Sequence, residues 1–317
     1  MARLASTSEI EYRAVSAYLG LAIGDALGAT VEFMSANEIA SHYGLHDQIR
    51  GGGWLKLKAG DVTDDTTMSL ALGKSILQHG GVDAEAVAEA FSQWYLQNPV
   101  DVGNTVKRGI IHFRYSGVPY VAWSEQDAGN GACMRTLPVA LATFFCDEDG
   151  ITTASREQAH VTHNNVLSDT ATECVINMLH LALQGGDKTK LLDCANQMLV
   201  QRFSEFTYLN DKIDNPSGYI VETLRAVLQA FNETDSFEQC LVNVVNRGGD
   251  ADTTGAIAGM LAGCLYGVDT FPSQWLDTLN NDIRNECERQ AIALLRMGDS
   301  IQGDNPVAIH KQEAVHV

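Results

Sequence analysis

The length of 317 residues, with 45% hydrophobic residues and only six prolines, allows one large buried core, and we find no linker that would divide it. Acidic residues outnumber basic ones by 40 to 21, and the net charge of −19 argues against nucleic acid or an anionic membrane as a partner. The seven cysteines form no Cys-x-x-Cys pair, and Asp25 interrupts the first apolar run. We therefore expect reduced thiols, no signal peptide, no membrane span and a cytoplasmic protein.

Apolar residues recur mostly at helical spacing, and period-two alternation is almost absent, so we expect a mainly α-helical chain. Glycine pairs at 80–81 and 185–186 are typical of helix ends, and Pro99, Pro138 and Pro272 lie near predicted helix starts. Periodicity fades from about Gly298, which indicates one domain over residues 1–300 and a peripheral tail over 301–317. The predicted helices run from Ser8 toward Gly28 and over residues 69–78, 84–96, 136–145, 166–183, 219–231, 256–266 and 275–297.

The first unusual segment, residues 60–68, reads Gly-Asp-Val-Thr-Asp-Asp-Thr-Thr-Met and precedes a predicted helix. Neighbouring side chains on a regular helix point about 100° apart, so Asp64 and Asp65 can converge on one cation only at a helix start. The alternative is that Thr63 or Asp64 simply caps the helix.

A second segment, residues 246–255, places Asp250, Asp252 and Thr253 after two glycines and before another predicted helix. These are hard oxygen ligands of the kind that Mg²⁺, Mn²⁺ and Ca²⁺ prefer. An EF-hand is excluded because the twelfth position, counted from Asp250, is Leu261 instead of glutamate. Two such segments in one chain favour a shared site for two metal ions, whose charge would offset the repulsion between the carboxylates.

Two further segments also precede predicted helices. Residues 129–135, with Gly129, Asn130 and Gly131, can aim backbone N–H groups at a phosphate, although a glycine-rich turn is often only a turn. Residues 99–105 carry Asp101 and Asn104, and Asp101 is equally well explained as a helix cap.

Taken together, these segments resemble the ADP-ribosylglycohydrolase family over roughly residues 15–290. The resemblance rests on Gly24-Asp25-Ala26-Leu27-Gly28 with Glu32, on Thr63-Asp64-Asp65-Thr66, on Gly129-Asn130-Gly131 with Met134-Arg135, and on residues 248–253. Residues 99–101 and 217–219 resemble the branch that acts on dinitrogenase reductase.

The resemblance implies an all-α fold, a single compact multi-helix orthogonal bundle, with two divalent cations, Mn²⁺ or Mg²⁺. It also implies ADP-ribose as ligand, an ADP-ribosylated protein as substrate, and cleavage at an arginine. Implied metal ligands are Thr63, Asp64, Asp65, Asp250, Asp252 and Thr253; implied ADP-ribose contacts are Asn104, Gly129, Asn130, Gly131, Met134, Arg135, His163 and Tyr219. Ala132-Cys133 departs from the family's usual Ser-Leu.

Cleavage of the bond between ribose and guanidinium needs a proton donor for the leaving nitrogen. Asp101 is the leading candidate for this acid/base role, and Glu32 and Glu125 are alternatives. Two other functions remain open at this point. One is a non-catalytic ADP-ribose reader or immunity protein, and the other is a metal-dependent phosphohydrolase. Without the resemblance, His163 would be interpreted as a surface or helix-end histidine, and Tyr219 equally well as a core residue.

Overall fold

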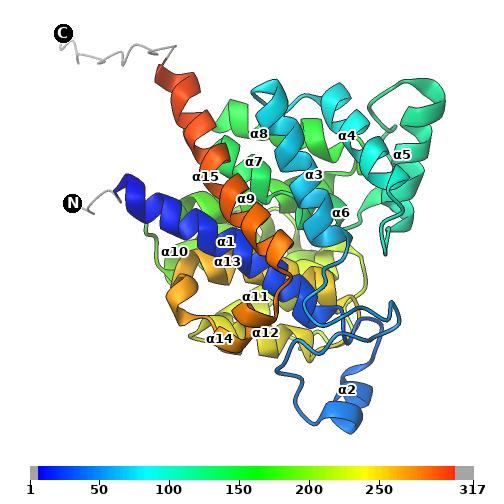
Figure 1. Ribbon diagram of the computed structural model, residues 1–317, viewed down its shortest axis with the longest axis vertical. Coiled ribbons are helices and arrows are strands. Elements are labelled where there is room, and N and C mark those ends of the chain that lie inside the picture. Colours follow the sequence, from blue (N-terminus) through cyan, green and yellow to red (C-terminus); the bar gives the residue numbers. More distant parts are fainter. Residues whose placement is uncertain (1–5, 304–317) are drawn as a thin grey trace.

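The computed structural model describes residues 6–303, and within that range the protein is built of helices, with isolated β-bridges but no strand (Figure 1). This confirms the predicted all-α fold. The α-helices are α1 (Thr7–Gly28), α2 (Ala36–Tyr43), α3 (Asp64–His79), α4 (Ala84–Leu96), α5 (Asn104–Ser116), α6 (Gly131–Met134), α7 (Leu137–Ala142), α8 (Glu148–Ala159), α9 (Val166–Leu183), α10 (Lys188–Ala195), α11 (Ile220–Glu233), α12 (Phe237–Val245), α13 (Ala251–Tyr266), α14 (Ser273–Thr278) and α15 (Asn281–Gly303). No helix in residues 6–303 is both long and apolar enough to span a bilayer.

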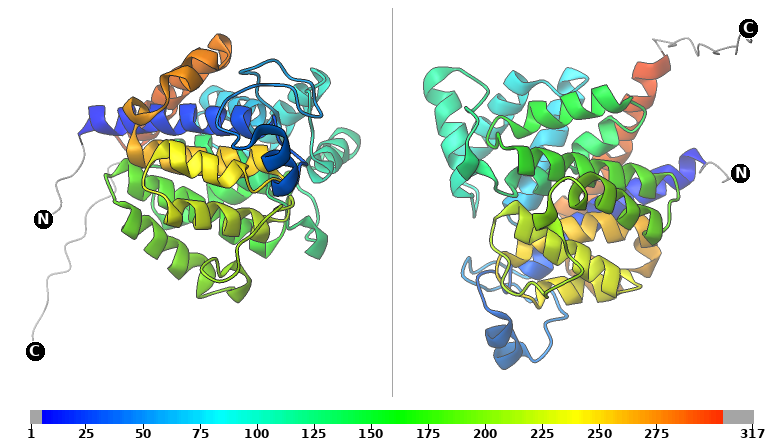
Figure 2. Two further views of the ribbon diagram at one scale, coloured as in Figure 1. Left: turned by 90° about the horizontal axis from the view of Figure 1, so that it is seen from below. Right: turned by 180° about the vertical axis from the view of Figure 1, so that it is seen from behind.

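Helices α1 and α13 lie side by side and antiparallel at the centre of the molecule (Figures 1 and 2). A Cβ atom added to Gly24 would lie 2.0 Å from the backbone oxygen of Gly255, and one added to Gly20 would lie 2.2 Å from that of Gly259. The two backbones are therefore closer than any side chain would permit. The close contact brings the end of α1 against the start of α13.

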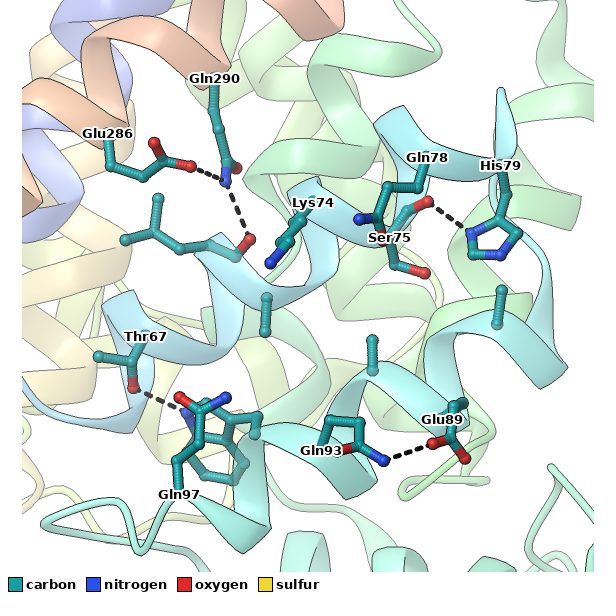
Figure 3. Close-up of a pocket in the computed structure, with 15 residues that line it drawn as sticks. Thr67, Lys74, Ser75, Gln78, His79, Glu89, Gln93, Gln97, Glu286 and Gln290 are labelled. Atoms are coloured by element: carbon teal, nitrogen blue, oxygen red, sulfur yellow. Dashed lines mark hydrogen bonds between the residues drawn. The ribbon is translucent and has the colours of Figure 1, made fainter.

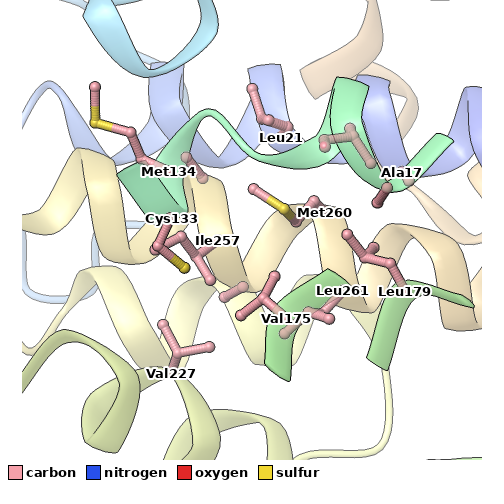
Figure 4. Close-up of a cluster of buried hydrophobic side chains, with 14 of the residues drawn as sticks. Ala17, Leu21, Cys133, Met134, Val175, Leu179, Val227, Ile257, Met260 and Leu261 are labelled. Atoms are coloured by element: carbon pink, nitrogen blue, oxygen red, sulfur yellow. The ribbon is translucent and has the colours of Figure 1, made fainter. Parts of the chain in front are cut away.

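The apolar core surrounds α13, whose residues from Ala251 to Cys264 are all buried. Leu21 of α1, Val175 and Leu179 of α9, and Met260 and Leu261 of α13 belong to this core (Figure 4). A helix that is apolar on every side is expected at the centre of a bundle, since no face of it is suited to water. Most other helices pack around this centre.

Several predicted helices are confirmed, and α4 and α9 have the predicted bounds. Helix α1 begins at Thr7, one residue before the predicted start at Ser8, because Ser6 and Glu9 form a capping box. The expected helix over 136–145 is the shorter α7, and the four-residue helix α6, which was not predicted, lies just before it.

The expected helix over 275–297 is likewise divided, because the backbone of Leu279 is extended and Asn280 accepts a hydrogen bond from the amide of Asp282 at 2.9 Å. Helix α15 continues to Gly303, beyond the predicted helix end at position 297. The predicted tail over 301–317 lies outside the described residues from position 304 onward.

Candidate active site

A cleft of about 690 Å³ opens where α1 ends and where α3, α5 and α13 begin. All four segments singled out from the sequence contribute side chains or backbone to it. The residues that line it are Glu32, Phe33, Trp54, Asp64, 101–106, 129–131, Met134, His163, 215–218, Gly249, Asp250, Asp252 and Thr253.

Asp25, in the last turn of α1, holds the start of α3 in place. Its fully buried carboxylate accepts hydrogen bonds from the amides of Thr63 and Thr66, and from the Thr66 hydroxyl at 2.6 Å. These amides belong to the first turn of α3, where backbone N–H groups have no partner within the helix. Asp25 therefore fixes Asp64 and Asp65 relative to α1.

The turn before α13 explains the two glycines of the second acidic segment. Gly248 and Gly249 have φ angles of 74° and 66°, and a Cβ on either would lie 2.2 Å from a neighbouring backbone oxygen. Gly249 also exchanges backbone hydrogen bonds with Phe33 and Met34. The turn thereby holds residues 32–34 beside the beginning of α13.

Acidic side chains from distant parts of the chain lie close together at this cleft. One oxygen each of Glu32, Asp250 and Asp252 lies within 4.8 Å of the others. The hydroxyls of Thr63 and Thr253 both donate to Oδ2 of Asp65 at 3.2 Å. Asp65 and Thr253 are 188 positions apart in the sequence, so this hydrogen bond brings the two predicted metal-binding segments together.

Burial and mutual repulsion raise the pKa of every carboxyl group in this cluster. Burial raises the pKa of Asp64 to about 7, and the nearby Asp101 and Asp25 add to the effect. Burial also raises the pKa of Glu32 to about 8, although the Trp54 indole opposes the change. For Asp65, Asp250 and Asp252 the pKa is likewise raised, with burial as the largest cause. The cluster is costly to ionise without a compensating cation.

The residues present fit a divalent cation. Oδ1 of Asp65 is fully buried and finds no hydrogen-bond partner anywhere in the described chain, which would be costly if nothing bound it. The other ligand atoms are carboxylate and hydroxyl oxygens, the donors that Mg²⁺ and Mn²⁺ favour. Thr63 does cap α3, as the alternative interpretation proposed, so capping and metal ligation are compatible at this residue.

Asp101 faces the cleft from the segment before α5 and is half-buried. It does not cap the helix, because Gly103 occupies the cap position and no side chain bonds there. Its Oδ1 instead accepts from the amide of Val102 at 2.7 Å, and burial raises its pKa. Asn104, the first residue of α5, also lines the cleft.

The predicted diphosphate segment differs in detail from expectation. The backbone N–H of Asn130 donates to the backbone oxygen of Gly218. The side-chain Nδ2 of Asn130 donates to Oδ2 of Asp250 at 2.6 Å, so Asn130 orients a carboxylate. Gly129 and Gly131 leave space for the His163 ring: a Cβ on Gly129 would lie 2.9 Å from Nε2, and one on Gly131 would lie 2.7 Å from Cε1. His163 is buried and lines the cleft, which excludes a surface histidine.

Of the predicted metal ligands, Thr63 and Asp65 are buried and do not line the cleft itself. Of the other predicted site residues, three do not line it. Arg135 is fully buried over the Phe91 ring and donates to Gln158 and Thr162. Its guanidinium therefore bonds residues of the protein interior and does not reach the cleft. Glu125 is exposed in the short helix η1 (Glu125–Asp127). Tyr219 is 40% exposed at the start of α11, which also excludes core packing, while its neighbours at 217–218 line the cleft.

The departure at Ala132-Cys133 has little bearing on the cleft, because both side chains are fully buried and neither lines it. Sequence reasoning missed the aromatic pair Phe33 and Trp54, whose ring centroids lie 5.3 Å apart at the cleft. The Trp54 indole donates to Oε2 of Glu32 at 2.7 Å. The run of three glycines at 51–53, followed directly by Trp54, could have drawn attention to this segment.

A second hollow, of about 460 Å³, lies between α3, α4 and α15 (Figure 3). Many of its polar groups already bond one another: Gln93 with Glu89, Gln290 with Glu286, and Trp94 with Thr67. None of the clustered carboxylates of the first cleft lines it. The chemistry is therefore concentrated in the acidic cleft.

Comparison with known proteins agrees with this geometry. The sequence profile of the ADP-ribosylglycohydrolase family matches residues 6–303. The chain belongs to this family. Members are metal-dependent hydrolases, and the buried acidic cluster is the part of this chain suited to metal ions.

Among relatives, this ADP-ribosylglycohydrolase is 48% identical over 285 residues to the ADP-ribosyl-[dinitrogen reductase] glycohydrolase of Rhodospirillum rubrum, covering 90% of this chain and 96% of that protein. It is 34% identical to the ADP-ribosylarginine hydrolase Tri1 of Pseudomonas putida, over 84% of this chain and 73% of the relative. A solved structure of an ADP-ribosylglycohydrolase-related protein complex superposes with a TM-score of 0.81 at 35% identity, covering 92% of this chain and 99% of the other.

Proposed function

We propose that this ADP-ribosylglycohydrolase removes ADP-ribose from an arginine side chain of a modified protein, and that dinitrogenase reductase is its target. The observation that carries the proposal is that Asp64 of α3 lines the same cleft as Asp250 and Asp252 at the start of α13, and that Thr253 donates a hydrogen bond to Asp65. The names of the two relatives point to arginine and to dinitrogenase reductase.

Thr63, Asp64, Asp65, Asp250, Asp252 and Thr253 are the residues that would hold two divalent cations, and Glu32 lies close enough to join them. When bound, the cations would supply positive charge beside the ribose and a polarised water. Mn²⁺ and Mg²⁺ both suit these oxygen donors.

The remaining residues bind, orient and exchange protons. Asp101 faces the cleft with Oδ1 fixed by Val102, while no residue in the range 6–303 forms a hydrogen bond to its Oδ2. We assign it the proton transfer to the departing guanidine, for which burial that favours the protonated form is an advantage. Glu32 remains the alternative, because it also lies in the cleft and its protonated form is favoured. Glu125 is set aside because it is exposed and does not line the cleft.

Two alternative functions explain fewer features of the site than ADP-ribosyl hydrolysis does. A non-catalytic ADP-ribose reader has no need of this many buried carboxylates, whose ionisation is costly without metal. A phosphohydrolase would release phosphate or AMP, whereas glycosidic cleavage releases intact ADP-ribose.

Product analysis with matched peptides tests the proposal. An arginine-ADP-ribosylated peptide, incubated with Mn²⁺ and enzyme, is expected to yield intact ADP-ribose and unmodified peptide, and chelation should abolish turnover. A serine-linked peptide should react more slowly. Faster release from serine would refute the arginine assignment, release of AMP would indicate a phosphohydrolase, and full activity in chelator would refute the metal site.

A further inference from the structure

The tautomer of His163 can be worked out from its surroundings. The ring is 2% exposed and lines the cleft with its Nε2 edge beside Gly129. Nδ1 lies 2.8 Å from the hydroxyl oxygen of Thr162. Burial, followed by the positive charges of Arg135 and Arg108, lowers the pKa of His163 well below its ordinary value. The ring is therefore neutral near pH 7, with one donor nitrogen and one acceptor nitrogen.

Thr162 determines which nitrogen is which. Its hydroxyl oxygen also lies 2.9 Å from Nη2 of Arg135. Burial lowers the pKa of Arg135 only to about 9, so the guanidinium stays charged near pH 7 and can only donate. Across residues 6–303, the hydroxyl has only these two hydrogen-bond partners, so its hydrogen has a single acceptor, Nδ1 of His163. A hydrogen on Nδ1 would leave the buried hydroxyl without any acceptor.

The guanidinium of Arg135 is fixed by other buried contacts, so it keeps donating to the Thr162 hydroxyl, which in turn donates to His163. Its Nε donates to the side chain of Gln158 at 2.9 Å, Nη2 also donates to the Gln158 backbone oxygen, and the group lies over the Phe91 ring at 4.5 Å. Gln158 in turn donates to the backbone oxygen of Ala132 at 3.1 Å. The cation cannot turn away from Thr162 without breaking several buried contacts.

We propose that Arg135 and Thr162 are positioning residues that keep the hydrogen of His163 on Nε2, so that the ring presents a hydrogen-bond donor to the cleft. Nε2 has no hydrogen-bond partner within the described chain, and it borders the segment 129–131. Its partner is an acceptor oxygen of the bound ligand, a diphosphate or ribose oxygen. The identity of that ligand rests on the proposed function, but the tautomer does not.

This inference gives Arg135 a role in place of the direct phosphate contact expected from the sequence. It also explains why both positions 129 and 131 are glycine: a methyl group at either would displace the imidazole. The donor is neutral, so it would bind an acceptor oxygen without the strong pH dependence of an imidazolium.

The experiment is ¹⁵N NMR of histidine-labelled, metal-free wild-type protein near pH 7, with His163→Gln used to assign the resonance. We expect a pyridine-type Nδ1 and a pyrrole-type Nε2. A pyrrole-type Nδ1, or a protonated ring, would overturn the inference. Because no ligand is present, this result stands whether or not the protein binds ADP-ribose.

Matched variants test the part played by Thr162. Thr162→Val removes the hydroxyl at nearly constant shape, and should mix the two tautomers and weaken ADP-ribose binding, measured by calorimetry with Mg²⁺, by about 2- to 10-fold. Thr162→Ser should restore both. Thr143→Val is the control, since Thr143 is a buried threonine whose hydroxyl, within residues 6–303, bonds only to the Val139 backbone oxygen. Wild-type tautomer and affinity in Thr162→Val would overturn the positioning role. Absence of ADP-ribose binding by the wild type would instead refute the proposed ligand.

Discussion

Replacement of Asp64 by asparagine should stabilise the metal-free protein at alkaline pH. Asp64 is buried beside other carboxyl groups, and its pKa rises from 3.8 to about 7. A rise of that size corresponds to about 4 kcal/mol in favour of the protonated group. Between these two pH values the folded protein binds more protons than the unfolded chain, so the free energy of unfolding falls as pH rises, and above about pH 7 the loss is complete.

Asp64→Asn removes this charge while keeping the shape, so in chelator at about pH 8 it should raise the free energy of unfolding by on the order of 2–4 kcal/mol. The gain should shrink at about pH 5, where the wild-type group is already protonated. With saturating Mn²⁺ the wild type should be more stable than Asp64→Asn, because only the wild type keeps the full set of metal ligands.

Thermal unfolding followed by circular dichroism, at both pH values with chelator and with Mn²⁺, measures the effect. The control is Asp277→Asn, an exposed position in α14 where no such change is expected. Equal stability of wild type and Asp64→Asn at about pH 8 in chelator would refute the reasoning that the cluster is repulsive.

Three other substitutions test the site and the fold. Asp252→Ala should abolish metal binding and turnover yet leave the metal-free fold intact, as metal analysis and circular dichroism would show; an unfolded variant contradicts this. Asp101→Asn should lower turnover about 10²- to 10⁴-fold with little change in ADP-ribose affinity, and near-normal turnover would move the proton transfer to Glu32. Gly24→Ala should destabilise the protein by about 3 kcal/mol or more, because its Cβ would lie 2.0 Å from a backbone oxygen of α13, whereas Gly81→Ala, in open space, should cost under about 1 kcal/mol.

The meeting of the acidic segments could be predicted from the sequence because the chemistry leaves few alternatives. Two Asp/Thr-rich helix starts in one chain would repel each other unless they shared cations, and Asp65 and Thr253 do form a hydrogen bond. The helical periodicity of α4 and the long apolar stretch of α9 were equally informative, since both are followed or preceded by clear end signals.

Side-chain direction in short elements could not be predicted in this way. Helix α6 has four residues, and a change of one residue in its start would redirect Arg135 and Cys133 entirely. Asp25 was also beyond sequence reasoning, because its partners Thr63 and Thr66 depend on how α1 and α3 cross. The spacing of Gly20, 24 and 28 was a missed signal, since one small residue every four positions along a helix indicates close helix contact.

The antiparallel pair of α1 and α13 has a consequence for the order of folding. Its two helices are separated by more than two hundred residues, and contacts between such distant parts of a chain form slowly because a large loop must close first. Local pairs such as α3 with α4 can form early, whereas Asp65 and Thr253 meet only after that closure. We therefore expect partly folded chains to lack the metal site, so that catalytic competence is gained in one of the last steps of folding.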